Sequence, residues 1–361
     1  MKILVIQSGG PSPVSNAALS RFTKIAAENG DEVWGAIKGW LGAAQGSFLR
    51  IPMDERWLSK LNRLPPPYLN TFRDKLADEE INALIDNVKT RFDALAVIGG
   101  DGSMTFLNEI QQKLGIPIVG IPKTIDNDLG PTFVDPGFPS AAHEAAKLSA
   151  ITRLDLMSYT GFIDVDVIQV MGRDAGWVTL STSLAGKLAP DLYLIPEGKY
   201  AVEEFVADVT RIVRRDRKAL LAVAEGVSIQ GNRITRAADY QRADSASSIS
   251  SLLKARGLRT RMEWPGILYR SIPPIKKDLF YVNSIAEQAV KVLRRSKTAM
   301  VGLEKDGELS PREFQLSEAI KRYVPKEYFQ GLAPTPEFLR YIKEVSSPVR
   351  LGQWVYPISQ S

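Results

Sequence analysis

Short apolar runs alternate with amphipathic helical patterns along most of this chain, and this alternation limits the folds open to it. Near-continuous apolar runs predict buried strands at residues 2–6, 32–37, 94–98, 116–121, 162–170, 192–195 and 220–224. Between them lie helical patterns at residues 15–28, 76–91, 103–114, 175–187 and 202–215. Buried strands separated by helices are typical of parallel sheets covered on both faces. We therefore predict an α/β fold.

The length of 361 residues suits two domains of about 100 to 200 residues each. The strand pattern falls into two runs, which favours two doubly wound, Rossmann-like α/β/α domains with the active site in the cleft between them. A stretch rich in Pro and Gly at 131–139 is a plausible break between the runs. The Ser-rich stretch at 244–251 is either a loop or the start of a helix.

The Cys and His content excludes several kinds of chemistry. The chain has no Cys, so it has no disulfide, thiol nucleophile or cysteine metal site. Its single His, His143, cannot build a multi-His zinc site, and we expect it to be structural. Acid–base catalysis must therefore fall to Asp, Glu, Lys, Arg or Tyr.

The charge and the lack of long apolar stretches favour a cytoplasmic protein that acts on small molecules. No apolar run approaches the roughly 20 residues needed to cross a bilayer, and the N-terminus does not resemble a secretory signal. A net charge of +5 suits acidic substrates such as phosphates and does not require nucleic acid. We expect neither a membrane nor a nucleic acid as partner.

Glycine-rich loops follow two of the predicted strands, and ligands of such sheets bind at strand ends. In residues 7–13, QSGGPSP, glycines allow the backbone to approach an anion, although a tight turn would also need them. In residues 98–103, IGGDGS, Asp101 can hold a magnesium ion bound to phosphate. Helix capping by Asp101 or Ser103 is the alternative.

Two further strand ends carry charged side chains. In residues 122–128, PKTIDND, Asp126 can accept a proton from a substrate hydroxyl while Lys123 neutralises a transferring phosphate. An Asx-rich turn is the alternative there. In residues 169–177, QVMGRDAGW, the guanidinium of Arg173 can bind a phosphate or a sugar oxygen.

In this order and at these spacings, GGDGS, PKTIDND and MGRDAGW resemble the motifs of the phosphofructokinase A family. The opening SGGPSPVSNA loop fits as well, and the resemblance extends from residue 1 to at least Arg270. The stretches at 295–302 and 323–325 look like the branch that contains many pyrophosphate-dependent members. The resemblance implies a phosphofructokinase-type kinase that uses Mg²⁺ and forms a dimer or tetramer. We expect a donor domain at 1–137 plus about 270–318, and a sugar-phosphate domain at 138–269 plus about 319–361.

The resemblance also implies roles for individual residues. Asp126 matches the general base that deprotonates the sugar 1-hydroxyl, and Asp101 matches the acid that positions Mg²⁺. The other residues expected to act in catalysis are Thr124, Lys123 and Arg173. Those expected to bind the donor are Gly9, Gly10, Arg73, Gly102 and Ser103. Those expected to bind the acceptor are Thr124, Asp126, Asp128, Met171, Gly172, Arg173, Glu225, Arg261, Tyr269 and Arg270.

Two positions bear on the phosphoryl donor. In this family a Gly at the fourth residue of GGDGS leaves space for a nucleotide, whereas an Asp there favours pyrophosphate. Gly102 therefore favours ATP. Lys123 points the other way, because pyrophosphate enzymes usually carry Lys in PKTIDND, but members that combine Gly with Lys are generally expected to use ATP. Pyrophosphate remains the alternative.

Two departures from the family pattern bear on the acceptor. Bacterial ATP-dependent members usually place a phosphate-binding Arg where this chain has Asp164, and many carry His or Tyr where it has Ile267. Fructose 6-phosphate is the expected acceptor, and another sugar such as sedoheptulose 7-phosphate is the alternative. A non-catalytic sugar-phosphate sensor and a nicotinamide oxidoreductase are rival classes. The intact Asp101, Asp126 and Arg173 argue against the sensor, and the missing G-x-G-x-x-G argues against the oxidoreductase.

Overall fold

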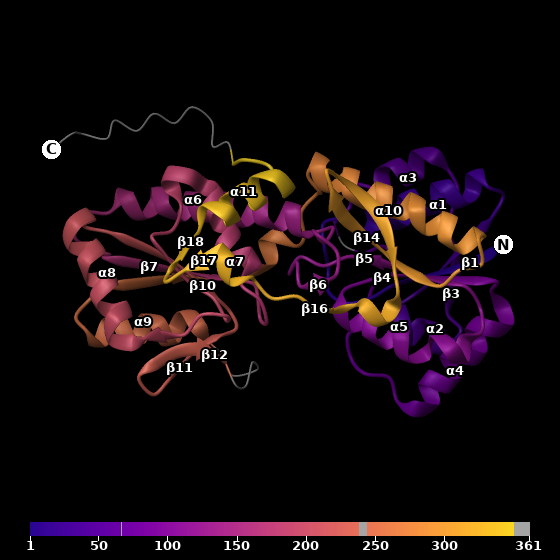
Figure 1. Cartoon of the computed structure of the whole chain (residues 1–361), viewed down its shortest axis with the longest axis horizontal. Helices are drawn as coiled ribbons and strands as arrows, with labels where there is room; N and C mark the ends of the chain where they lie inside the picture. The colour runs from indigo at the N-terminus through magenta and orange to yellow at the C-terminus, as the bar shows by residue number, and fades with distance from the viewer. Residues whose placement is uncertain (66, 238–243, 350–361) are drawn as a thin grey trace. The chain divides into compact units, whose positions relative to one another are not determined.

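The computed structural model describes residues 1–65, 67–237 and 244–349 of the chain (Figure 1). Its internal contacts divide it into two compact units. Unit 1 consists of Met1–Ala141 and Gly266–Val324, and unit 2 consists of Ala142–Pro265 and Pro325–Ser361.

Unit 1 is built on a seven-stranded sheet with the order β15-β14-β5-β4-β1-β2-β3. Its strands are β1 (Lys2–Gln7), β2 (Glu32–Ala36), β3 (Phe48–Arg50), β4 (Ala94–Gly99), β5 (Ile118–Pro122), β14 (Ala299–Asp306) and β15 (Glu308–Phe314). The five inner strands pair in parallel, and β3 and β15 join the two edges antiparallel. The carboxyl ends of β1, β4 and β5 therefore meet at one edge of the sheet, where ligands of such folds bind.

Helices cover both faces of this sheet (Figure 1). On one face lie α1 (Ser15–Glu28), α3 (Glu55–Leu61) and α10 (Lys276–Arg294), and on the other lie α2 (Gly39–Ala44), α4 (Asp78–Arg91) and α5 (Asp101–Leu114). Leu4 of β1, Val97 of β4 and Leu107 of α5 share one buried core cluster. The sheet strands are apolar throughout because side chains on both faces are buried.

Short elements complete unit 1 next to the strand ends. β6 (Leu129–Gly130) pairs antiparallel with β16 (Ile320–Lys321), so a segment late in the chain lies beside the loop that follows β5. The short 3₁₀ helices η3 (Gly266–Tyr269) and η4 (Leu316–Glu318) also belong to this unit. The long helix α6 (Phe138–Ser158) begins in unit 1 and continues in unit 2.

Unit 2 contains a four-stranded parallel sheet with the order β13-β7-β10-β8. The strands are β7 (Val165–Val170), β8 (Leu192–Leu194), β10 (Ala219–Ala224) and β13 (Thr260–Glu263). Smaller antiparallel sheets are formed by β9 (Tyr200–Ala201), β11 (Val227–Gln230) and β12 (Arg233–Arg236), and by β17 (Phe329–Gln330) and β18 (Ala333–Pro334). The helices are α7 (Trp177–Ser181), η1 (Thr182–Leu188), α8 (Val202–Asp216), α9 (Ser245–Ala255), η5 (Lys326–Tyr328) and α11 (Pro336–Val345).

The two parallel sheets with their flanking helices confirm the predicted α/β class. The expected helix at 15–28 has the predicted bounds, and the Ser-rich stretch is the start of α9, which Asp244 caps by accepting a 3.1 Å bond from the backbone N–H of Ser247. The prediction of a single helix at 175–187 is wrong. The α-helix ends at Ser181, and a 3₁₀ segment that contains Gly186 at φ +62° follows. Among the described residues, no helix is both long and apolar enough to cross a membrane.

Candidate active site

The loops after β1 and β4 are tied together by their serines. The hydroxyl of Ser103 donates a 2.9 Å bond to the hydroxyl of Ser8, and the backbone N–H of Ser8 donates to the carbonyl of Ile98. Gly9 has φ +79°, a left-handed conformation that favours glycine. A side chain at Gly9 would point at Lys123, since an added Cβ would lie 3.5 Å from its Nζ atom. These contacts gather Gly9, Ser103 and Lys123, three residues predicted from separate motifs.

Three cationic side chains lie around Gly9 and Gly10. Lys123 donates a 2.7 Å bond from Nζ to the carbonyl of Gly10. An added Cβ at Gly10 would lie 4.0 Å from the guanidinium of Arg73 and 4.0 Å from Nη1 of Arg270. Arg270, which we expected at the distal phosphate of the acceptor, thus lies beside the loop expected to bind the donor. The arrangement can neutralise a phosphoryl group placed against these glycines.

Lys123 is an unusually buried amine. The residue is 3% exposed, and burial lowers the pKa of its ammonium to about 8, although the charge of Asp126 opposes this shift. An ammonium held in a poorly hydrated position interacts strongly with an incoming anion.

Asp126 is the accessible carboxylate of the loop after β5. Of the ten residues 121–130, all of which the structure describes, it alone is not buried. Its backbone N–H donates a 3.1 Å bond to the hydroxyl of Thr124, which fixes the turn that carries it. An accessible carboxylate on a rigid turn can accept a proton from a ligand.

Arg322 stabilises the rest of this loop. Its guanidinium donates to the carbonyls of Asn127, Thr132 and Phe133, with distances between 2.6 and 3.1 Å. Asn127 has φ +54°, and its side chain accepts a 3.0 Å bond from the backbone N–H of Asp135. The motif did not indicate Arg322, which lies about 200 residues away along the chain.

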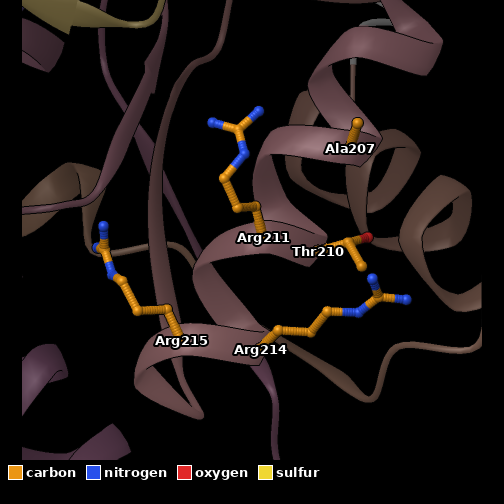
Figure 2. A pocket seen from close by; sticks show the side chains of 5 residues that line it. All are labelled: Ala207, Thr210, Arg211, Arg214 and Arg215. Carbon is orange, nitrogen blue, oxygen red and sulfur yellow. The ribbon is translucent and has the colours of Figure 1, made fainter.

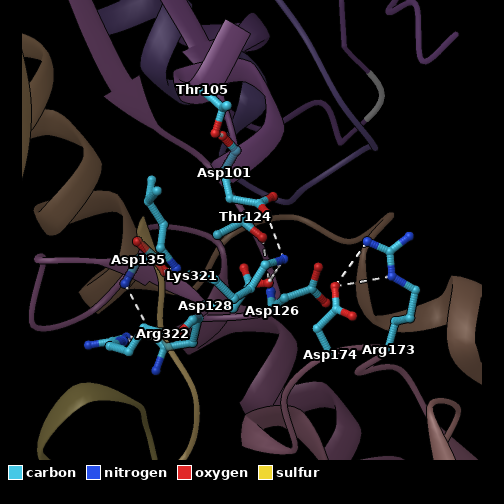
Figure 3. Close-up of polar contacts among 12 residues, drawn as sticks. Asp101, Thr105, Thr124, Asp126, Asp128, Asp135, Arg173, Asp174, Lys321 and Arg322 are labelled. Atoms are coloured by element: carbon cyan, nitrogen blue, oxygen red, sulfur yellow. Dashed lines mark hydrogen bonds and ion pairs between the residues drawn. The ribbon is translucent and has the colours of Figure 1, made fainter. Parts of the chain in front are cut away.

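Asp101 begins α5, and its carboxylate pairs with Lys321. Nζ of Lys321 lies 2.6 Å from Oδ2 of Asp101 and 2.9 Å from Oδ2 of Asp128 (Figure 3). The buried Asp135 is near this pair, and burial raises its pKa to about 8, against the charge of Arg322. The sequence motifs did not indicate Lys321 or Arg322.

The carboxylates of Asp101 and Asp128 fit a magnesium ion. Among the described residues, no group of three or more His, Cys, Asp or Glu side chains could hold a metal. Mg²⁺ needs less, because it is usually held by one or two carboxylates together with water and substrate phosphates. The oxygens of Asp101 and Asp128 that contact one ammonium are hard ligands of this kind.

In unit 2, the loop after β7 carries Met171, Gly172 and Arg173. Gly172 has φ +136°, and its N–H lies 3.4 Å from the carboxylate of Glu225. Arg173 forms a two-point contact with Asp174, at 2.9 and 3.1 Å (Figure 3). An added Cβ at Gly226 would lie only 1.8 Å from the carbonyl oxygen of Arg173, so the loop of Arg173 packs directly against the backbone of Gly226.

Arg261 is surrounded by acids, which makes it a poor phosphate ligand. Its guanidinium pairs with Asp166 and Asp155, each at 2.5 Å, and with Glu263 at 3.2 Å. Asp166 is fully buried, and burial raises its pKa. A phosphate at Arg261 would have to displace or oppose these carboxylates. The role of Arg261 as an acceptor ligand stays a prediction.

Tyr269, another predicted acceptor residue, also differs from expectation. Tyr269 is fully buried, which leaves its ring no surface for a ligand, whereas Ile267 is 65% exposed. Asp164 forms an ion pair with Arg259, whose side chain and backbone N–H both donate to it at 2.5 to 2.9 Å. This contact lowers the pKa of Asp164, and the pair lies at the amino end of β7, the end opposite the loop of Met171, Gly172 and Arg173.

A hollow of about 670 Å³ lies against α8 but contains none of the predicted site residues (Figure 2). It is lined by Ala207, Thr210, Arg211, Arg214 and Arg215. Arg211 pairs with Asp208 and Arg215 with Asp216 on the same helix. The hollow is therefore not the candidate active site.

The fold and these loops define the class of the protein, a phosphoryl-transfer enzyme of the doubly wound α/β type. The chain belongs to the phosphofructokinase family, because the family model described as Phosphofructokinase matches residues 2–293. Its relatives are sugar phosphate kinases and phosphotransferases, and this chain is an enzyme of that type.

The curated relatives differ in donor and acceptor. The chain is 26% identical to a sulfofructose kinase from Alkalicoccus urumqiensis, with 95% of each chain covered. It is 27% identical to a pyrophosphate–fructose 6-phosphate 1-phosphotransferase from Dictyoglomus thermophilum, covering 92% of this chain and 97% of the relative. It is 31% identical to the ATP-dependent 6-phosphofructokinase 1 of Clostridium perfringens, covering 83% and 88%.

A solved structure shares the fold over most of this chain. The pyrophosphate-dependent phosphofructokinase from Marinobacter aquaeolei matches with a TM-score of 0.85 at 24% identity, covering 96% of this chain and 92% of that one. At this identity the match supports the fold alone.

Proposed function

We propose that this protein transfers the terminal phosphoryl group of ATP to the 1-hydroxyl of fructose 6-phosphate. The observation that carries the choice of donor is the space at Gly102. Beyond its own helical turn, no atom of the described chain lies within 4 Å of a Cβ added there. Open space next to Ser103 and the Gly9 loop suits ATP, because ATP carries an α-phosphate and a nucleoside that pyrophosphate lacks.

In this proposal, unit 1 binds the donor and activates the acceptor hydroxyl. The backbone of Gly9 and Gly10 and the hydroxyl of Ser103 receive the donor phosphates, while Lys123, Arg73 and Arg270 neutralise their charge. Mg²⁺ held by Asp101 and Asp128 would supply further charge neutralisation on the phosphates.

Asp126 acts as the general base. Its carboxylate takes the proton from the primary hydroxyl, and the hydroxyl oxygen attacks the terminal phosphorus in line with the leaving oxygen. Thr124 holds the turn that aims Asp126. In unit 2, the loop of Met171, Gly172 and Arg173 and the carboxylate of Glu225 bind the sugar phosphate.

A second acceptor is favoured by one observation. The ion pair between Asp164 and Arg259 occupies the position where bacterial ATP-dependent members resembling this chain carry a phosphate-binding arginine. A longer sugar phosphate, such as sedoheptulose 7-phosphate, or a sugar with a different terminal group, such as the sulfofructose that one relative is named for, would suit this change. Pyrophosphate is the alternative donor, supported by the buried ammonium of Lys123. We further propose that the enzyme works in the cytoplasm as a dimer or tetramer.

A donor–acceptor matrix tests this proposal. ATP and pyrophosphate, each with Mg²⁺, are offered with fructose 6-phosphate, sedoheptulose 7-phosphate, sulfofructose and an unphosphorylated ketose, and the product is followed by phosphorus NMR. We expect turnover with ATP and fructose 6-phosphate. Turnover with pyrophosphate alone would contradict the donor assignment, and turnover only with another sugar would contradict the acceptor assignment.

A further inference from the structure

The segment that carries Lys321 is rigidly attached to the catalytic loop. β16 pairs with β6 in the register Lys321 opposite Leu129, and the backbone N–H of Arg322 donates a 2.7 Å bond to the carbonyl of Asp128. The guanidinium of Arg322 binds three further carbonyls of the same loop. These hydrogen bonds fix the backbone of Lys321, so the fold itself determines where this lysine lies.

The ammonium of Lys321 bridges the two carboxylates that fit a metal. Its distances of 2.6 Å to Asp101 and 2.9 Å to Asp128 place the two accepting oxygens no more than about 5.5 Å apart. The Lys321 side chain is 25% exposed and that of Asp128 6% exposed, so solvent screens this contact only in part. The ammonium between the two carboxylates reduces the repulsion of their negative charges.

We propose that Lys321 is a built-in counter-ion that occupies the cation position between Asp101 and Asp128 and must withdraw when a divalent ion binds there. The ammonium holds both carboxylates in place. It also lowers the affinity of the site for a free metal, because one cation must leave as the other arrives. This inference rests on the proposed role of Asp101 and concerns how the metal is admitted.

The consequence is a coupling between metal and donor. The binding free energy of a free divalent ion is reduced by the cost of displacing the ammonium. A metal already bound to a phosphate donor brings negative charge with it, to which the released ammonium can turn. The enzyme should therefore take up the metal–donor complex far better than the metal alone.

Direct binding of Mn²⁺, used as a probe for Mg²⁺, tests the proposal without measuring activity. Free Mn²⁺ is counted by electron paramagnetic resonance in titrations of the full chain without donor. We expect Lys321→Met to bind Mn²⁺ about tenfold more tightly than the wild type, since a competing charge is lost. Lys321→Gln should do the same, and it serves if the Met variant does not fold. Lys113→Met, which removes an exposed lysine of α5, should leave the affinity unchanged.

The outcomes separate the inference from the proposed function. Equal Mn²⁺ affinity in the wild type and in both Lys321 variants would overturn the role of Lys321. Weaker binding of the donor in these variants, with unchanged Mn²⁺ affinity, would also overturn this role, because Lys321 would then be a phosphate ligand. Adding Asp101→Asn to Lys321→Gln should abolish the tightened site. If tightened binding survives that second change, the metal assignment of Asp101 is wrong.

Discussion

Nζ of Lys123 donates a 2.7 Å hydrogen bond to the carbonyl oxygen of Gly10, which joins the loop after β5 to the loop after β1. The two residues are 113 positions apart in the sequence, and each belongs to a motif that was interpreted separately. The bond places a buried positive charge next to the glycines that are proposed to bind the donor.

Burial lowers the pKa of Lys123 to about 8, so its ammonium is present below that pH and is lost above it. We expect kcat/KM for the donor to fall about tenfold for each pH unit above pH 8, because the neutral amine no longer attracts phosphate. Steady-state kinetics between pH 6 and 10 measure this. In Lys123→Arg the charge persists, and the alkaline fall should vanish. If kcat/KM still falls in the same way in that variant, the titration of another group, such as Asp135, causes the fall.

Gly102→Asp should change the choice of donor without disturbing the fold. The open space at Gly102 leaves room for the side chain, and its charge would repel the α-phosphate of ATP. We expect kcat/KM for ATP to fall by at least about tenfold relative to that for pyrophosphate. Gly102→Ala, which adds volume without charge, should keep the wild-type ratio. An unaltered ratio in both variants, at unchanged thermal stability, would show that this position does not select the donor.

Asp126→Asn should reduce kcat by about a hundredfold to ten-thousandfold, because it removes the proposed general base but keeps the shape of the turn. Binding of fructose 6-phosphate, measured by calorimetry, should change much less. The matched control is Asp86→Asn on α4, an exposed carboxylate that should leave kcat unaltered. Near-normal turnover in Asp126→Asn would rule out the assignment.

The buried carboxylate of Asp278 should make stability depend on pH. It accepts bonds from the backbone N–H groups of Gly137 and Ser140 and from the Ser140 hydroxyl, but burial still raises its pKa to about 6. The folded state therefore holds this proton more tightly than the unfolded state does. The free energy of unfolding should decline as pH rises from about 4 to 6, by about 3 kcal/mol from this group.

Urea unfolding of the wild type and of Asp278→Asn at several pH values isolates that contribution. The Asn variant loses an acceptor and is expected to be less stable at low pH, but its stability should decline less across this range. If the two proteins show parallel pH profiles, the carboxylate of Asp278 is not protonated on folding.

Gly226→Ala should impair the loop of Arg173. The added Cβ would clash with the carbonyl of Arg173 at 1.8 Å, so this loop must move. We expect KM for the sugar to rise about tenfold or more while donor binding is kept. The control is Gly231→Asn, at an exposed turn with φ +60° that Asn tolerates. An equal change in both variants would point to general destabilisation rather than to the loop.

The motif residues could be predicted from the sequence because each follows a strand of a parallel sheet. The apolar strands β1, β4 and β5 were evident from their composition, and their common direction brings Gly9, Asp101 and Asp126 to one edge. The order of the strands and the side chains that reach across them could not be predicted in the same way. Arg261 illustrates this, because β13 pairs with β7 and places it opposite Asp166. No spacing in the sequence reveals that contact.

Lys321 and Arg322 escaped prediction for a related reason. We expected residues 319–361 in the second domain, whereas internal contacts group these two residues with unit 1. Two-residue strands such as β6 and β16 have no periodicity to detect. Their pairing depends on tertiary contacts formed by the whole unit.

The short pairing of β16 with β6 also bears on how relatives of this protein are recognised and dissected. The family match ends at residue 293, and β14, β15, Lys321 and Arg322 all lie after it. A fragment cut at that point would keep every diagnostic motif. It would nevertheless lose two strands of the large sheet and the arginine that fastens the Asp126 loop. The stretch by which such an enzyme is identified is thus shorter than the stretch that builds its large sheet and supports its catalytic loop.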